Sequence, residues 1–317
     1  MSSAMTSTGS AVPADPRTLP NPPGFCWLRV GDLECVAVSE GDAGAPPGGG
    51  QLIAGTPPEE VFGLLRAHGG GRQEPRISVT ALATRRGERT ILIDSGFGIF
   101  ETPDGLNRPG HVQLNLAAAG IAAQDVDLVI ISHPHGDHVG GLLTPQGELT
   151  YPNARYVLPR REWQFWMESE PDLSTALIPD GFKQAMKMQA RTVLPRLEGR
   201  IELVEPGEEV EPGMRLLATP GHTHGMIGVE IDGGGQRLLY LADVFMHPVL
   251  SIKRPDWRVP MDLDGKTSEA TRRQLLERVA SSGELCFCTH FPWPALGWII
   301  ERDGENQWVP LDWRWWS

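Results

Sequence analysis

The chain has 317 residues and carries 28 Lys and Arg against 40 Asp and Glu, which gives a formal net charge of −12. This acidic balance argues against nucleic acid as a partner, because phosphate binding requires a basic surface. Apolar residues make up 40% of the chain, yet no stretch approaches the roughly 18–20 apolar residues that cross a bilayer. The four cysteines are too few for a disulfide scaffold and favour a reduced, cytoplasmic location.

Residues 1–24 are rich in Ser, Ala and Pro without a hydrophobic period, so we expect a disordered leader there. From Phe25 onward, hydrophobic periodicity and turn residues predict alternating strands and helices. In chain order, we expect strands at 25–30 and 33–39, a helix at 56–68, strands at 77–84 and 90–96, a helix at 112–120, strands at 126–132 and 155–158, helices at 160–168 and 181–197, strands at 201–205, 215–219, 226–231 and 237–242, a helix at 267–280 and a strand at 284–289. Hairpins dominate both halves and no linker interrupts residues 25–317, which favours one α/β domain of two face-to-face sheets covered by helices.

The most informative segment follows the apolar strand at 126–132 and reads His133-Pro-His135-Gly-Asp137-His138. Imidazole and carboxylate groups together suit zinc and related borderline metals. In an extended loop, His133 and His135 project to the same side and can bind one ion, while Asp137 and His138 come one turn later and can face a second ion. The alternative interpretation is a surface loop that meets metal only adventitiously.

Three further ligand-type residues, His222, Asp243 and His290, each lie at the end of a predicted strand. Loops at strand ends can bring side chains from distant parts of a chain to one point. Two ions need about seven protein ligands, and the sequence supplies that number with little to spare. We expect one ion on His133, His135 and His222, the other on Asp137, His138 and His290, and Asp243 as a bridge between them.

Together, these motifs resemble those of the metallo-β-lactamase-fold superfamily. The matching segments are Asp94-Ser95-Gly96, His133 to His138, Gly221-His222, Asp243 and His290, and the resemblance spans about residues 27 to 300. It implies a four-layer αβ/βα sandwich, in which two mixed sheets are flanked by helices and the metals lie at the edge between the sheets.

The sequence around the motifs is similar to that of the methyl parathion hydrolase-like group, in the segments HVGGL, YPNARYVLPRREWQFW, TPGHTHGMIGV and THFPWPALG. This resemblance implies a dinuclear hydrolase that uses a metal-bridging hydroxide on a small ester, lactone or organophosphate-type substrate. The expected cofactors are two divalent ions, zinc first, with manganese or iron as alternatives. Lactonases that resemble this group often carry a Tyr three residues after the bridging Asp, where this chain has Met246 followed by His247.

Other functions stay open on the same ligands. A glyoxalase II-like thioesterase shares all seven, so only the substrate pocket separates it from an esterase. Iron-dependent oxygen or sulfur chemistry would need a redox-active metal, and a non-enzymatic binding protein would not need so complete a ligand set. The related β-lactamases lack the bridging carboxylate for which Asp243 stands, and this chain has neither the inserted domain nor the basic face of the RNA-processing members.

Several residues beyond the ligands are candidates for roles in the reaction. Asp94 is placed to accept a hydrogen bond from a ligand imidazole and fix its tautomer, and the alternative is that it only caps a turn. Asp137, His247 or water could protonate the leaving group. Trp166 and Met246 are expected to line the substrate pocket, although aromatic residues at such spacing also pack cores.

The C-terminal segment contains Trp313, Trp315 and Trp316. We expect it to be a packing plug or a subunit contact rather than a membrane anchor, because no basic patch accompanies it. The expected partner is a small-molecule substrate, with neither nucleic acid nor a membrane, and a homodimer stays open.

Overall fold

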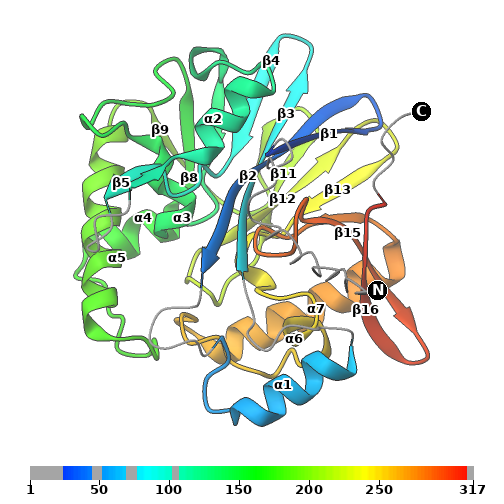
Figure 1. Ribbon diagram of the computed structural model, residues 1–317. Helices are drawn as coiled ribbons and strands as arrows, with labels where there is room; N and C mark the ends of the chain where they lie inside the picture. The colour runs from blue at the N-terminus through cyan, green and yellow to red at the C-terminus, as the bar shows by residue number, and fades with distance from the viewer. Residues whose placement is uncertain (1–23, 45–51, 69–76, 102–106, 313–317) are drawn as a thin grey trace, which may run out of the picture.

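The computed structural model describes residues 24–44, 52–68, 77–101 and 107–312 of the chain. The expected leader (apart from Gly24) and the Trp-rich segment at 313–317 lie outside the described residues. Two seven-stranded sheets dominate the described part (Figure 1). Within that part, no helix is long and apolar enough to cross a membrane.

The first sheet comes from the N-terminal part of the chain. In spatial order it contains β1 (Phe25–Val30), β2 (Leu33–Gly44), β3 (Ile77–Arg86), β4 (Arg89–Ile93), β7 (Leu128–Ile130), β8 (Arg155–Pro159) and β9 (Ile201–Val204). Strands β1 to β4 pair antiparallel, whereas β4, β7, β8 and β9 pair parallel. The carboxyl ends of the parallel strands therefore meet at one edge of this sheet.

The second sheet comes from the C-terminal part. It contains β10 (Glu209–Glu211), β11 (Met214–Ala218), β12 (Ile227–Asp232), β13 (Arg237–Tyr240), β14 (Leu285–Phe287), β15 (Leu296–Arg302) and β16 (Glu305–Pro310). Only the β13–β14 pair of this sheet is parallel. The short strands β10, β15 and β16 were not expected from the sequence, nor was a separate hairpin of β5 (Ile99–Glu101) and β6 (Asn107–Pro109).

Helices lie on the outer faces of both sheets. The longer ones are α1 (Pro58–Ala67), α2 (His111–Ala118), α5 (Asp180–Val193) and α7 (Gly265–Ser282). The shorter ones are η2 (Ala123–Asp125), α3 (Gly136–Val139), η3 (Gly140–Leu142), α4 (Arg160–Trp163), η4 (Gln164–Glu168), η5 (Leu194–Leu197), η6 (Ala242–Val244) and α6 (Leu250–Lys253). Figure 1 shows α2, α4 and α5 together on one side, and α1, α6 and α7 together at the bottom of the view.

Alternation along the strands explains the layers. In β2, the buried side chains of Cys35 and Ala37 pack between the two sheets, whereas Val36 and Val38 pack outward with residues of α2 and α5. In the second sheet, α7 covers the outer side through buried residues that include Leu276. Successive side chains of a strand point to opposite faces, so a buried sheet is apolar on both. The helix–sheet–sheet–helix order confirms the expected four-layer αβ/βα sandwich.

Two predicted helices differ in detail. The helix expected from Thr56 begins at Pro58, and its N-cap is Pro57, which offers no side-chain acceptor. The helix expected at 160–168 is α-helical only in α4, because the π-helical turn η4 follows it. Such π-helical turns often occur at functional sites.

Candidate metal centre

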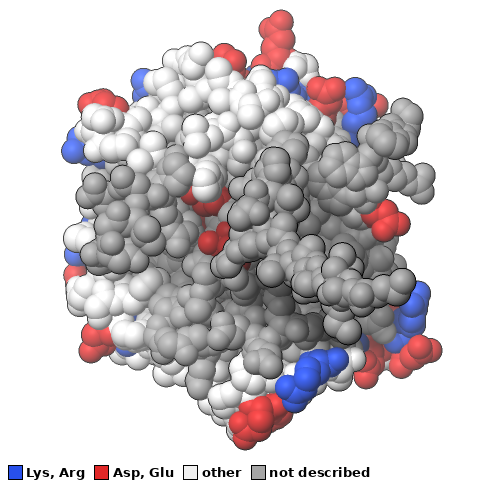
Figure 2. All heavy atoms as spheres, viewed as in Figure 1, with Lys and Arg blue, Asp and Glu red and all other residues white. Residues whose placement is uncertain are grey.

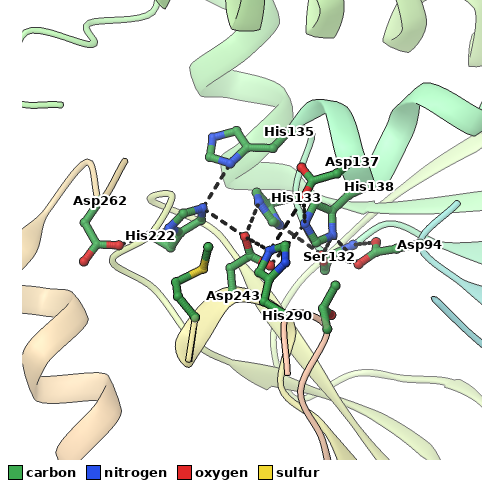
Figure 3. A network of polar contacts seen from close by, with 12 residues as sticks. Asp94, Ser132, His133, His135, Asp137, His138, His222, Asp243, Asp262 and His290 are labelled. Carbon is green, nitrogen blue, oxygen red and sulfur yellow. Dashed lines mark hydrogen bonds and ion pairs between the residues drawn. The ribbon is translucent and has the colours of Figure 1, made fainter. Parts of the chain in front are cut away.

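The seven expected ligands converge at the edge where both sheets end (Figure 3). The segment from His133 to His138 follows β7 of the first sheet. His222, Asp243 and His290 follow β11, β13 and β14 of the second sheet. The face viewed in Figure 1 has a hollow near its middle in which acidic side chains are visible (Figure 2).

The ligand-type side chains form two groups. In each, the candidate ligand atoms lie within 4.8 Å of one another. The first group contains His133, His135, His222 and Asp243, and the second group contains Asp137, His138 and His290. The histidines and Asp137 divide as the sequence predicts, and Asp243, expected as a bridge, falls in the first group.

Asp243 lies between the two groups. Its Oδ2 is 3.2 Å from His222 Nε2 in the first group and 3.0 Å from His290 Nε2 in the second. Its Oδ1 is 3.1 Å from His138 Nε2. One carboxylate therefore faces ligands of both groups, which is the geometry that a bridge requires.

The unpaired atoms of this cluster fit a divalent cation. Among the described residues, Nε2 of His133 and His135 is buried without a hydrogen-bond partner, and Nε2 of His138 and Oδ1 of Asp243 face one another without hydrogen-bond geometry. Buried polar atoms almost always have a partner, so convergent lone pairs of nitrogen and oxygen point to an electrophile between them. Imidazole and carboxylate are the donor set that zinc prefers.

Three ligand rings are held from behind. The Nδ1 atoms of His138, His222 and His290 lie 2.7 Å from Asp94 Oδ2, 3.0 Å from Asp262 Oδ1 and 2.8 Å from the Ser78 carbonyl oxygen, respectively. Each acceptor keeps a proton on Nδ1 and leaves the Nε2 lone pair directed at the centre.

Asp94 is the most connected of these acceptors. Its carboxylate accepts hydrogen bonds from the Ser132 backbone (2.8 Å), the Ser132 hydroxyl (2.7 Å) and the Tyr240 hydroxyl (2.6 Å), besides facing His138. Its backbone is left-handed, with φ of 60°, a conformation that costs energy for most side chains but less for Asp. The role expected for Asp94 and the turn that it makes therefore occur together.

Sequence reasoning missed Asp262 and Tyr240. Asp262 is fully buried with Arg272, whose guanidinium bonds to the carboxylate and also donates to the Trp257 carbonyl oxygen at 3.0 Å. Burial alone would raise the pKa of Asp262, but the hydrogen bond with His222 and the charge of Arg272 hold it below the usual value. A Tyr directly after the apolar pair Leu238-Leu239, toward the end of a strand that precedes a ligand, is the signal that could have identified Tyr240.

Charges within the cluster are unequal. Burial and the neighbouring imidazoles hold the pKa of His133 well below its usual range, so this ring is neutral and free to bind metal. Burial also lowers the pKa of His222, but Asp243 and Asp262 outweigh it and raise the value to about 9. A cation bound between these groups must therefore displace protons that Asp243 attracts.

The other expected site residues lie elsewhere. Trp166 is fully buried, donates its Nε1–H to Glu162 at 2.8 Å and meets His135 edge-on, so it supports the centre from behind rather than forming an open pocket wall. Met246 is 2% exposed and packs in a small apolar cluster with Trp257.

His247 caps a helix. Its Nδ1 accepts hydrogen bonds from the backbone N–H groups of Val249 (3.1 Å) and Leu250 (3.3 Å) at the start of α6. Burial lowers the pKa of His247 to about 4. The ring is therefore neutral near pH 7, with its proton on Nε2.

Known proteins resemble this chain in sequence and in fold. The family model of the metallo-beta-lactamase superfamily matches residues 74–290. A probable metallo-hydrolase of Mycobacterium tuberculosis is 27% identical over 222 residues, which are 62% of this chain and 66% of that protein. The N-acyl homoserine lactonase AiiA of Bacillus thuringiensis subsp. kurstaki is 31% identical over 126 residues, which are 39% of this chain and 41% of the lactonase. The matches thus span less than two thirds of these relatives' length.

Solved structures agree over more of the chain. The dizinc quorum-quenching lactonase AidC, in complex with the product N-hexanoyl-L-homoserine, superposes with a TM-score of 0.81 at 25% identity and covers 92% of this chain and 98% of its own. The hydrolase AbOPH of the beta-lactamase superfamily gives a TM-score of 0.82 at 23% identity, with 93% and 100% covered. The family match covers more than half of the chain and includes every residue of both ligand groups. This chain therefore belongs to the metallo-β-lactamase superfamily.

Proposed function

We propose that this protein is a dinuclear metal-dependent hydrolase of small ester, lactone or organophosphate-type substrates. The observation that carries the proposal is the pair of buried ligand groups with Asp243 between them. The relatives give support, since one similar structure is a dizinc lactonase with its hydrolysed product and one relative is a probable metallo-hydrolase.

The metal ions would supply the reactive water and the Lewis acid, and the side chains hold and orient the ligands. Two divalent ions supply, when bound, a water of lowered pKa and a Lewis acid for the oxygen that gains charge. The first group would hold one ion and the second group the other, while Asp243 contacts residues of both groups. Asp94, Asp262 and the Ser78 carbonyl keep the ligand rings in orientation.

Asp137 is the ligand best placed to handle a proton. Its side chain is 14% exposed, whereas the imidazoles of His138 and His290 beside it are at most 1% exposed. Its Oδ2 lies 3.6 Å from Nε2 of each of these rings. A carboxylate at the surface of the cluster can transfer a proton to a departing alkoxide, and the Nε2–H of His247, four residues after Asp243, is a second candidate donor.

Metal analysis and a substrate panel test the proposal together. Purified protein should contain about two metal equivalents and hydrolyse a nitrophenyl ester, a lactone or a nitrophenyl phosphotriester. His133→Ala should lower both the metal content and the turnover. His224→Ala is the matched control, because this half-buried histidine lies two residues from His222 and belongs to neither group.

Outcomes separate the alternatives. Full metal content and full activity in His133→Ala would refute the site. Turnover of thioesters alone would favour a glyoxalase II-like thioesterase, and a visible iron spectrum with redox activity would favour iron chemistry.

A further inference from the structure

A buried glutamate beside the metal centre has no part in the reaction described above. Glu162, in α4, is fully buried. Its Oε2 accepts the Nε1–H of Trp166 at 2.8 Å, and its Oε1 accepts the backbone N–H of Gly225 at 2.5 Å. Both donors are neutral, and among the described residues no Lys or Arg forms an ion pair with it. A buried carboxylate without a cationic partner is costly, which calls for a compensating interaction nearby.

Each partner of Glu162 leads to a ligand of the first group. The Trp166 ring meets the His135 ring edge-on, with centroids 5.9 Å apart and planes at 82°. Gly225 lies in the loop between β11 and β12 that also carries His222. Glu162 thus joins two ligands that come from opposite sheets.

The packing around this contact is tight. A Cβ atom on Gly225 would lie 2.8 Å from the Arg161 Cβ and 3.0 Å from the Glu162 backbone nitrogen, so the loop and α4 approach as closely as a glycine allows. On the other side, the Trp166 carbonyl oxygen accepts the Nε–H of Arg191 from α5 at 3.1 Å. Packing therefore fixes the position of Glu162. Glu162 in turn fixes the segment of Trp166 and the loop between β11 and β12.

The charge of Glu162 is a second way in which this residue can stabilise a cation in the first group. With a cation bound and its imidazoles deprotonated, the first group offers three neutral rings and one carboxylate, Asp243, which also faces the second group. A divalent ion on this side therefore keeps an excess of positive charge, whereas the second group has Asp137 as well as Asp94 behind His138. Asp262, behind His222, is paired with Arg272, whereas the carboxylate of Glu162, on the other side of the first group's loops, has no Lys or Arg partner among the described residues.

Resting on the two-metal function proposed above, we propose that Glu162 is a positioning residue for the first group. It fixes His135 through Trp166 and the His222 loop through Gly225, and its charge offsets that of the cation held there. The ion of the first group then depends on Glu162, and the ion of the second group does not.

The test measures the two metal equivalents separately. Zn²⁺ is titrated against a chromophoric chelator in wild type, Glu162→Gln and Glu168→Gln, and Co²⁺ loading reports the spectrum of each equivalent. In Glu162→Gln, one equivalent should bind about 10–100-fold more weakly, as for other outer partners of ligands, with a changed Co²⁺ spectrum. The exposed Glu168 of η4 gives the control, in which both equivalents should stay as in wild type. A His135→Ala variant shows which equivalent belongs to the first group.

Several results would overturn this inference. The first is a Glu162→Gln variant that binds both metal equivalents with wild-type affinity. The others are an equal loss of affinity for both equivalents, or a loss of affinity only for the equivalent of the second group. If Glu162→Gln does not fold by circular dichroism, Trp166→Phe replaces it, since it keeps the ring against His135 but removes the donor to Glu162. Trp166→Phe should weaken the same equivalent. Absence of hydrolysis with the predicted metal asymmetry intact would refute the proposed function and leave the inference standing.

Discussion

Replacement of Asp94 by Asn tests how the metal centre is held from outside. Asn keeps the size of the side chain and tolerates the left-handed backbone at this position, where φ is 60°. It removes the negative charge behind His138 and leaves one acceptor oxygen where the carboxylate has two. Ser132, Tyr240 and His138 then compete for that oxygen.

The expected loss can be estimated from these contacts. Removing such a partner of a ligand costs about 10–100-fold in metal affinity, or ~1.4 to ~2.7 kcal/mol. Asp94→Ala should cost more, because it leaves the buried Tyr240 hydroxyl and the Ser132 N–H without their acceptor, at roughly 1–3 kcal/mol each. The alanine variant is therefore expected to lose folding stability as well as metal, whereas the asparagine variant loses mainly metal.

Chelator competition gives the metal affinity, and urea unfolding of the loaded protein gives the stability. Asp180→Asn is the control, since this side chain is 95% exposed at the start of α5. An Asp94→Asn variant that binds both equivalents as tightly as wild type would contradict this prediction. So would an Asp94→Ala variant that unfolds at the same urea concentration as Asp94→Asn.

Three further predictions concern other residues. Because burial lowers the pKa of His247 from 6.5 to about 4, the unfolded chain binds more protons between these values, so the free energy of unfolding should fall by up to ~3 kcal/mol as pH drops from about 6.5 to 4. His247→Asn keeps a cap acceptor for α6 and should flatten this slope in denaturant titrations. Arg272→Met should lower the free energy of unfolding by about 3–5 kcal/mol, because the buried Asp262 loses its guanidinium partner and keeps only His222, and adding Asp262→Asn should restore part of the loss. A nitrophenyl ester should give a higher kcat/KM than an acyl-homoserine lactone of similar size, since a nitrophenolate departs without a proton whereas the alkoxide of an opened lactone needs one; a lactone preferred by about tenfold would contradict this.

The sequence predicted the elements that carry their own periodicity. The strands that became β2, β3, β12 and β13 were predicted from their apolar residues and the turns that bound them, and the ligand loops from their places at strand ends. The hairpin of β15 and β16 was missed, although Asp303 and Gly304 between the strands, both with positive φ, form an Asp-Gly turn that favours a hairpin. The aromatic residues of this segment obscured the alternation of apolar and polar residues.

The partners behind the ligands were harder to predict. Asp94 could be expected because it belongs to a motif, but Glu162 and Asp262 lie in no motif near a ligand. Glu162 lies 63 positions from Gly225, and Asp262 lies 40 positions from His222. Contacts over such separations depend on how the two sheets pack, which local pattern does not encode.

Each ligand group draws residues from both sheets, so an ion in either group is a cross-link between them. The loop after β7 supplies the ligands from one sheet, and the loops after β11, β13 and β14 supply those from the other. The bond from His290 to the Ser78 carbonyl, 212 positions away in the chain, runs along the same seam. Opening of this edge of the sandwich would separate the ligands of each group, so local opening should speed the release of metal. Slow exchange of the amide hydrogens along the seam would accompany slow loss of metal. Chelation would remove the cross-link between the sheets and speed hydrogen exchange at this edge.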